Sequence, residues 1–576
     1  MLSGFLPFER LPKELIVHAL QFCRFTDILR FSATCQKYFH LVHNTTSLQL
    51  QIELEANRLQ TASNHTPVGQ QQLLEALKGY RDNWLDLSLV QGQTIVRAPN
   101  GELFTLWELR GGILANGYST LEFRDLQANA LQLVSLDDPF SRWNLTFQEY
   151  FDELTMDPSQ DLLVLTTVDQ TNSNMLSVRF CSLRTGLAHP LAMRPVVLLQ
   201  LEFSVTPYPT YSTICLYIVD ELLLLNLVCN EFVEPSNGVF CEVLVLNWRT
   251  GELLNRMGKC EGFCNAICLD RDRLAVFFVQ TISSAMPPSS MSLLLYDDIR
   301  TPRAACLPQS EAVCCISAYA PLRSVLSLGF PEFNPGAVIV LPDFLVRSEP
   351  LPSDLQHSGP KFVPDPLCRT LCLTMRLADE VDHANIVVFI DVQRLLYYLS
   401  QKSTRSLLWH EWGEEATRWA ELLDPPSHWI SCMRGSRFVM SKHIQDQPPQ
   451  LMIADFNTTL VRRFKTRESD RYKVVQAAQQ SEDIADGIWP YITQEAITQE
   501  PGECEMVVLI TEEDAPTVIR DLSATPIISK LPYRLSTVAG PLVTYNDWMI
   551  DGNRLIGIKT NPEGISDLFV IHYIND

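Results

Sequence analysis

The chain has 576 residues, of which 46% are hydrophobic and 19% are charged. This composition is typical of globular proteins and excludes disordered, collagen-like and coiled-coil chains. The formal net charge is −22, so the chain lacks the broad positive surface by which general nucleic-acid binders attract phosphate. We therefore expect about two to four globular domains and no nucleic-acid partner.

No N-terminal secretion signal is expected, because the apolar residues there are interrupted at Glu9, Arg10, Lys13 and Glu14. The longest apolar stretch, residues 216–229, contains two acidic residues and falls short of the ~18 apolar residues that a membrane span needs. We expect a cytoplasmic or nuclear protein without a membrane partner. Its 16 cysteines are then reduced and act mainly as small buried apolar residues.

Residues 1–50 differ from the rest of the chain in charge and in periodicity. Five basic residues against three acidic ones give this segment a charge of +2, which leaves −24 for the remainder. Its apolar residues recur at helical spacing, and Thr26 is predicted to cap the second helix. So small a segment buries little surface. We expect two or three short helices that serve either as the cap of a larger domain or as a docking module that a partner completes.

The segment from residue 6 to residue 48 resembles an F-box. The resemblance rests on the Leu11-Pro12-x-Glu14-Leu15 opening, the Asp27-Ile28-Leu29 step and the Ser32…Cys35…Phe39 tail. Cys23-Arg24-Phe25 departs from the usual first loop of the family.

The resemblance implies an F-box domain over residues 1–48 that binds the Skp adaptor of an SCF-type cullin–RING ubiquitin ligase. The adaptor-binding residues that it implies are Leu11, Pro12, Leu15, Ile16, Ile28, Leu29, Phe31 and Cys35. For each of them the alternative role is packing inside the module. The basic charge of the segment would complement the acidic adaptor of this family.

Residues 49–88 predict a helical linker. Leu73, Leu77, Tyr80 and Trp84 recur at helical spacing, and a polar loop separates them from an earlier apolar run. We expect two helices that form a stiff spacer between the F-box and the body of the protein.

Residues 89–576 predict a β-propeller-like domain of about seven blades that recognises the substrate. Short apolar or β-branched runs alternate with Gly, Pro, Asn and Asp turns, without the regular helices of a parallel α/β fold. These runs begin at Leu162, Ile214, Glu242, Leu274, Ser292, Ala337, Asn385, Gln450, Met506 and Leu568. Two β-sandwiches are the alternative. The fold class is therefore mainly β with an all-α N-terminus.

A weak repeat supports the propeller. The turn of residues 182–186 resembles that of residues 247–251, and polar residues at strand ends follow at steps of 45 to 65 residues, close to the length of a four-stranded blade. The Trp-Asp and Gly-His pairs of true WD repeats are missing, so the propeller is WD-like but degenerate. The strand at Leu568–Ile574 is expected to pair with the first strand, near Gln93–Glu108, and close the ring.

Two later segments are similar to F-box proteins of basidiomycete fungi with a propeller-like C-terminal region. They are His410–Trp419, and Leu531–Arg534 followed by Met549–Lys559.

The search for catalytic chemistry is negative. His410-Glu411 lacks the second histidine of a zinc protease motif, and we interpret it as a turn that buries Trp412 and Trp419. Cys260, Cys264 and Cys268 lack zinc-site spacing and fit strands of a reduced core. The acidic pairs of residues 297–298 and 414–415, and the run 512–514, are typical of solvated turns. We predict no catalytic residue, no metal and no cofactor.

These observations predict a non-catalytic receptor whose partners are the Skp adaptor, a cullin and a protein substrate still to be identified. Two alternatives stay open. One is a β-propeller enzyme with a helical cap, which requires His, Asp or Glu side chains to converge in a central channel. The other is an F-box scaffold protein that acts outside the ligase.

Overall fold

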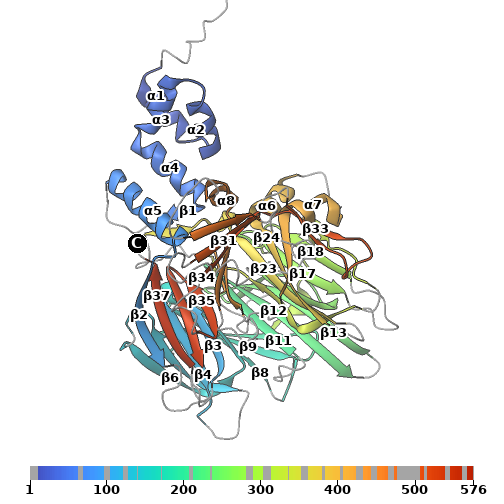
Figure 1. Ribbon diagram of the computed structural model, residues 1–576. Coiled ribbons are helices and arrows are strands. Elements are labelled where there is room, and N and C mark those ends of the chain that lie inside the picture. Colours follow the sequence, from blue (N-terminus) through green and yellow to red (C-terminus); the bar gives the residue numbers. More distant parts are fainter. Residues whose placement is uncertain are drawn as a thin grey trace, which may run out of the picture.

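The computed structural model describes most of the chain. The described residues are 11–62, 69–96, 104–120, 127–138, 140–169, 171–205, 212–233, 236–280, 290–302, 313–334, 337–351, 361–378, 383–401, 406–422, 432–442, 450–464, 472–476, 506–511, 515–538, 545–560 and 567–574. A helical N-terminal region stands on one face of a β-propeller (Figure 1). Among the described residues, no helix is both long and apolar enough to cross a bilayer.

The N-terminal module begins with three short helices, where two or three were predicted. They are α1 (Lys13–Leu20), α2 (Phe25–Ser32) and α3 (Gln36–His43). Their apolar stripes meet in one small core, which Leu48 and Ile52 of α4 (Thr46–Ala56) complete. The fourth helix is therefore part of the module, and the predicted boundary at residue 48 falls within it.

The prediction that Thr26 caps the second helix is wrong. Helix α2 begins at Phe25, and Arg24 at the cap position makes no side-chain hydrogen bond to it. Instead, the backbone N–H of Phe25 donates to Glu55 Oε2 of α4 at 2.8 Å. The first N–H groups of a helix have no partner within the helix, and here one of them donates to a residue 30 positions further along the chain.

The linker contains the two predicted helices. Helix α4 is followed by β1 (Leu59–Thr61) and then by α5 (Gln70–Leu85). Leu77, Tyr80 and Trp84 of α5 pack into a core that also holds strands of the propeller. The first strand of the propeller, β2, begins at Leu89.

Seven sheets surround a central axis, which confirms the seven-bladed propeller and excludes two sandwiches. Blades 1 to 4 follow in chain order, and the innermost strand of each is given first. Blade 1 is β3 (Phe104–Arg110), β4 (Ile113–Tyr118), β5 (Ala128–Ser135) and β6 (Arg142–Phe151). Blade 2 is β7 (Glu153–Asp157), β8 (Leu162–Val168), β9 (Met175–Ser182) and β10 (Val196–Gln200), with β19 (Val313–Cys315) added in parallel. Blade 3 is β11 (Ser212–Val219), β12 (Leu222–Val233), β13 (Ser236–Asn247) and β14 (Glu252–Arg256), with β15 (Cys260–Glu261) also on β13. Blade 4 is β16 (Phe263–Cys268), β17 (Leu274–Gln280), β18 (Ser290–Tyr296) and β20 (Leu326–Gly329), with β25 (Ser406–Leu407) added in parallel.

Blades 5 to 7 carry the insertions. Blade 5 is β21 (Val338–Arg347), β23 (Thr370–Ala378), β24 (His383–Asp391) and β26 (Thr417–Leu422). Blade 6 is β27 (Met433–Arg434), β28 (Arg437–Lys442), β29 (Gln450–Asp455), β34 (Tyr533–Val538), β31 (Met506–Thr511) and β30 (Tyr472–Gln476). Blade 7 is β35 (Asp547–Asp551), β36 (Arg554–Thr560), β37 (Asp567–Ile574) and β2 (Leu89–Val96). Smaller elements are β22 (Phe362–Pro364), β32 (Thr517–Ile519), β33 (Ile527–Ser529), α6 (Val392–Ser400), α7 (Trp409–Ala416), α8 (Thr458–Phe464) and the 3-10 turns η2 (Pro158–Gln160), η3 (Ile316–Ala318) and η4 (Pro366–Cys368).

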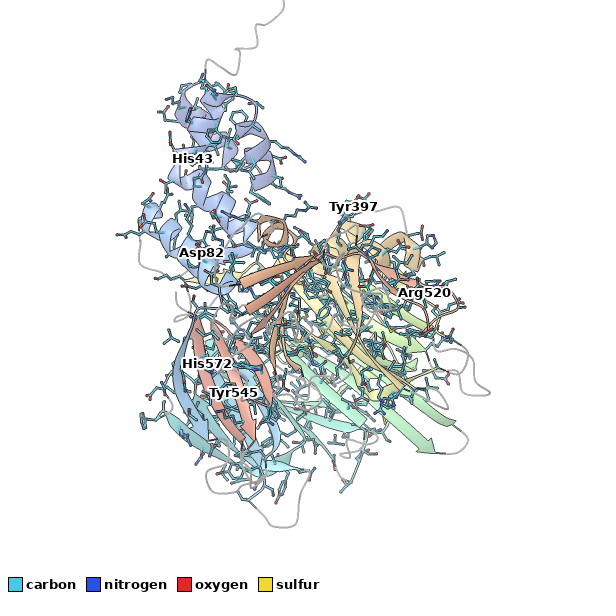
Figure 2. All side chains as sticks on the ribbon, in the orientation of Figure 1. His43, Asp82, Tyr397, Arg520, Tyr545 and His572 are labelled. Carbon is cyan, nitrogen blue, oxygen red and sulfur yellow. The ribbon has the colours of Figure 1, made fainter. Side chains whose placement is uncertain are left out.

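The first and last strands of the propeller close the ring, as predicted. Strand β2 pairs antiparallel with β37, with Leu89 opposite Ile574. Blade 7 then contacts blade 1 through polar groups, since Tyr573 donates to the carbonyl of Leu136 at 3.1 Å. Within the blade, His572 and Tyr545 lie side by side, with 3.0 Å between Nε2 and the hydroxyl oxygen (Figure 2).

The predicted repeat is real at the level of one turn. Gly186 and Gly251 both have positive φ angles, of 69° and 72°, which glycine adopts without strain. Each donates its N–H, at 2.8 Å, to the carbonyl of the residue four positions earlier, Ser182 or Asn247. The shared Arg-Thr-Gly sequence therefore forms the same turn after the third strand of blades 2 and 3.

Candidate functional site

The N-terminal module turns several large apolar side chains outward. Leu15 is 54% exposed, Phe22 80%, Leu29 44% and Phe39 51%. His43, labelled in Figure 2, stacks on Phe39 with ring centroids 5.6 Å apart. Exposed side chains of this size on three adjoining short helices are unusual for a surface that stays in water.

The eight predicted adaptor-binding residues separate into three groups. Pro12, Leu15, Leu29 and Cys35 are exposed. Leu11 and Phe31 are half-buried against the module core, whereas Ile16 and Ile28 lie inside that core, 1% and 0% exposed.

For Ile16 and Ile28 the structure therefore shows the alternative role, internal packing. Phe22 is the exposed apolar residue that the sequence interpretation did not include. It follows the end of α1 and lies outside the apolar stripe of that helix.

Glu53 joins the module to the propeller. One of its carboxylate oxygens lies 2.9 Å from Nη1 of both Arg81 of α5 and Arg463 of α8, and the other lies 3.0 Å from Arg463 Nη2. Burial alone would raise the pKa of Glu53, but hydrogen bonds and charges from Arg463 and Arg81 hold it below its usual value. A buried carboxylate with two guanidinium partners is well compensated.

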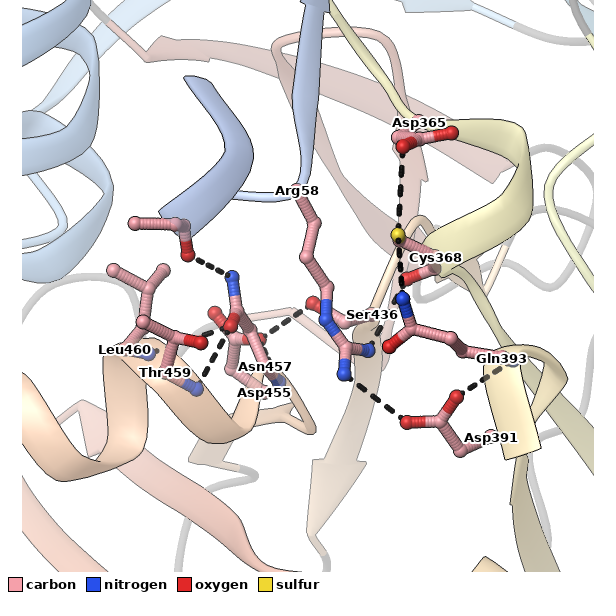
Figure 3. Close-up of polar contacts among 11 residues, drawn as sticks. Arg58, Asp365, Cys368, Asp391, Gln393, Ser436, Asp455, Asn457, Thr459 and Leu460 are labelled. Atoms are coloured by element: carbon pink, nitrogen blue, oxygen red, sulfur yellow. Dashed lines mark hydrogen bonds and ion pairs between the residues drawn. The ribbon is translucent and has the colours of Figure 1, made fainter. Parts of the chain in front are cut away.

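The chain between α4 and β1 adds a second set of links to the propeller (Figure 3). Arg58 has a φ of 55°, and its guanidinium reaches Asp391 Oδ2 at 3.1 Å and the carbonyl of Cys368 at 3.2 Å. On the other side, the Nδ2 of Asn457 donates to the carbonyl of Ala56 at 3.1 Å. Strand β1 also pairs antiparallel with β22 of the propeller. The linker is thus joined to the propeller by hydrogen bonds, an ion pair and a strand pairing.

A central channel with a volume of about 1230 Å³ lies at the end of the axis where most of the innermost strands finish. Val363 and Pro364 of β22 line it, so this end of the channel faces the helical region. The same face carries Tyr397 of α6 (Figure 2).

Two carboxyl groups from neighbouring inner strands face the channel. Glu108 of β3 accepts from Thr155 Oγ1 at 3.2 Å and from the backbone N–H of Met156 at 3.0 Å. Burial raises the pKa of Glu108 to about 7, although the positive charge of Arg110 acts to lower it. Burial also raises the pKa of Glu153 to about 8, and the negative charge of Glu108 adds to the shift. Side chains with pKa values near neutrality can exchange protons at physiological pH.

These shifts predict a pH dependence of stability that Glu153→Gln removes. Glu153 binds its proton more tightly in the folded chain than in the unfolded chain, where its pKa has the ordinary value of 4.5. Its stabilising contribution is therefore present below pH 4.5 and is lost as the pH rises towards about 8. Between pH 4.5 and about 8, the free energy of unfolding of the wild type should fall by about 2–4 kcal/mol relative to that of Glu153→Gln. Denaturant unfolding of both proteins at mildly acidic and mildly basic pH checks this, and parallel pH profiles would contradict it.

The other candidates of the sequence interpretation have structural roles. Residues 409–416 form a helix and not the predicted turn, although Trp412 and Trp419 are buried as expected. A Cβ atom at Gly413 would lie 2.1 Å from the ring of Trp409, so this aromatic cluster requires the glycine. The segment of residues 409–419 thus contributes to the core.

The remaining polar and sulfur candidates lack a catalytic arrangement. Cys264 and Cys268 are buried in β16, but Cys260 is exposed and not in the core. Lys530 binds Glu414 at 2.8 Å, and residues 512–514 lie outside the described residues. Within the described ranges, no three His, Cys, Asp or Glu side chains gather closely enough to hold a metal ion.

By its fold, the chain is a seven-bladed β-propeller with a helical N-terminal module. No family model matches the chain, and no curated protein matches it. Among similar solved structures, the β-propeller domain of the trilobed protease from Pyrococcus furiosus is 8% identical, with 61% of this chain and 93% of that one covered and a TM-score of 0.27. An apocarotenoid oxygenase mutant from Synechocystis is 8% identical, with 49% and 56% covered and a TM-score of 0.25. A chain of the mitotic checkpoint complex is 9% identical, with 62% and 92% covered and a TM-score of 0.24.

The chain spans little more than half of the oxygenase. Structural similarities as distant as these three give no information about the function of this chain.

Proposed function

We propose that this protein is a non-catalytic substrate receptor of an SCF-type cullin–RING ubiquitin ligase in the cytoplasm or nucleus. Its N-terminal module binds the Skp adaptor, and its propeller binds a target protein. One observation carries the proposal: in the segment that resembles an F-box, Leu15 and Leu29 are turned outward on a folded helical module. Exposed side chains of this kind gain free energy when a partner covers them.

Charge supports an acidic partner for this module. Its basic residues Lys13, Arg24, Arg30 and Lys37 are all exposed. Residues 1–50 carry a net charge of +2, whereas the remaining 526 residues carry −24. Such complementarity speeds association with an acidic adaptor more than it tightens the complex.

The receptor acts by positioning. Helix α4 belongs to the module core through Leu48 and is held to the propeller through Glu53, so one rigid element spans both parts. A target held by propeller loops would then stay at a fixed distance from the ligase. A fixed distance raises the effective concentration of target lysines near the ubiquitin carrier.

Affinity capture tests the proposal. The tagged chain is expressed in cells that contain an SCF ligase, and immunoblots for the adaptor and for the cullin are compared between variants. Leu15→Asp with Leu29→Asp should abolish recovery of both, because each would place a charge in the apolar surface that the adaptor is proposed to cover. The control is Phe140→Asp, which alters a side chain 95% exposed on the propeller and should leave recovery unchanged.

The same experiment separates the two alternatives. A propeller enzyme with a helical cap is favoured by the convergence of Glu108, Glu153 and Asp157 on the channel, and it would recover no adaptor. An F-box scaffold would recover the adaptor without the cullin. Recovery of both proteins by the double variant would contradict the F-box assignment.

A further inference from the structure

The outer edge of blade 1 is open. Strand β6, ten residues long, is the last strand of its sheet, and within the described part of the chain no strand pairs with its outer side (Figure 1). In blades 2, 4 and 6 a further strand adds in parallel at the outer edge, as β19 on β10, β25 on β20 and β30 on β31. Blade edges of this propeller thus accept added strands, and an open edge offers unpaired backbone N–H and C=O groups.

The register of β6 identifies the groups that point outward. The N–H of Ser135 donates to the carbonyl of Ser141 at 3.2 Å, and opposed residues of an antiparallel ladder alternate between bonded and non-bonded pairs. Counting from this bonded pair, Asn144 and Thr146 occupy non-bonded positions opposite β5. Their backbone N–H and C=O groups therefore point away from β5. Both residues are exposed, and no backbone group elsewhere in the described chain bonds to them.

Exposed apolar side chains lie beside this edge, in the loop between β9 and β10 of blade 2. A Cβ atom at Gly186 would lie 3.4 Å from the ring of Phe147 in β6, so the loop lies against the strand. Leu187 follows and is 71% exposed, and further along the loop Leu191 is 55% and Met193 79% exposed. A strand added outside β6 would turn every second side chain towards blade 2, where this loop lies.

The loop holds these side chains on a fixed backbone. The N–H of Met193 donates to the carbonyl of Arg249 at 2.7 Å, and that of His189 donates to the carbonyl of Phe180 at 3.0 Å. The N–H of Leu191 donates to Nδ1 of His189 at 3.2 Å. A surface that is already ordered pays little conformational entropy when a partner binds.

We propose that the open edge of blade 1 binds an extended segment of a partner protein. The backbone of that segment pairs with Asn144 and Thr146, and its alternate apolar side chains contact Phe147 and Leu187. The identity of the partner rests on the proposed function, in which it is the target protein. A second copy of this chain is a poorer occupant, because two chains of net charge −22 repel each other.

Selection from a phage library of random twelve-residue peptides on the purified full-length protein tests this. We expect enrichment of peptides with alternating apolar residues. The most enriched peptide is then synthesised and titrated into the wild type and the variants, where it should bind the wild type saturably with a stoichiometry of one.

Thr146→Pro and Thr146→Val form a matched pair. Proline removes the outward N–H group and is tolerated in edge strands, whereas valine keeps that group and favours a strand. Thr146→Pro should weaken peptide binding roughly tenfold, and Thr146→Val should not. Leu187→Asp should also weaken it. Its control is Leu408→Asp, which alters a side chain 61% exposed at the start of α7 in blade 5.

Hydrogen exchange of the wild type provides a measurement that needs no variant. The bound peptide should slow exchange in the segment of residues 142–148. The variant with Leu15→Asp and Leu29→Asp should bind the peptide as the wild type does, so loss of adaptor binding and loss of peptide binding are separate outcomes.

Four results would overturn the proposal. They are no enrichment of any peptide, equal affinities of Thr146→Pro and Thr146→Val, protection only outside residues 142–148, and a wild-type dimer that Thr146→Pro converts to a monomer. The last, measured by analytical ultracentrifugation, would assign the edge to contacts between copies of this chain.

Discussion

Ile28→Asp is expected to unfold the N-terminal module, whereas Leu29→Asp, one residue further along α2, is expected to leave it folded. Ile28 is 0% exposed in the module core, so an aspartate there would place an unpaired carboxylate among apolar side chains. The cost is about 3–5 kcal/mol, more than so small a core can lose. Leu29 faces water, where a substitution typically costs about 0.5 kcal/mol or less.

Limited trypsin digestion distinguishes the two variants. Lys13, Arg24, Arg30 and Lys37 are cleavage sites inside the module, and folding protects them. Rapid cleavage of Ile28→Asp and wild-type resistance of Leu29→Asp are the expected results. Equal sensitivity of the two variants would mean that the inward and outward faces of α2 are wrongly assigned.

Glu53→Ala is expected to lower the free energy of unfolding by about 3 kcal/mol and to loosen the module from the propeller. The substitution leaves the guanidinium of Arg81, only 11% exposed, with the carboxylate of Asp82 as its remaining ion-pair partner among the described residues. It also removes both bonds to Arg463. Loss of one partner from a buried ion pair is costly because the other charge stays desolvated. Denaturant unfolding measures the loss, and small-angle X-ray scattering measures the wider spread of module positions.

A pH series and a matched variant complete this test. Because the folded pKa of Glu53 is depressed, its stabilisation is present above about 4.5 and is lost as the pH falls through the folded value. The difference between wild type and Glu53→Ala should therefore shrink in acid. Glu75→Ala removes an exposed carboxylate from α5 and should change little. A loss in Glu75→Ala as large as that in Glu53→Ala would argue against a special role for Glu53.

Local patterns were enough to predict the architecture. Strand β17 begins at Leu274, where the apolar run begins, and the last strand, β37, closes the ring by pairing with the first, β2. Each blade needs only short apolar strands and tight turns, and both have strong local signatures.

Details that depend on distant contacts could not be predicted in this way. Leu15 and Ile16 are adjacent in one apolar stripe, and only the packing of the module shows that Ile16 is inside and Leu15 outside. The cap at Phe25 depends on Glu55 of another helix. Arg110 lies more than 200 residues before Arg347, Arg369 and Arg434, the other buried arginines that line the channel. Each one alone resembles an ordinary polar residue near a strand end.

The most direct test of the receptor assignment is titration of a purified Skp adaptor into the purified full-length chain. The wild type should bind saturably with a stoichiometry of one. Leu15→Asp with Leu29→Asp should bind about 100-fold more weakly, and Phe140→Asp should match the wild type. No binding by the folded wild type, or equal affinity for the double variant, would contradict the assignment of this module as an F-box.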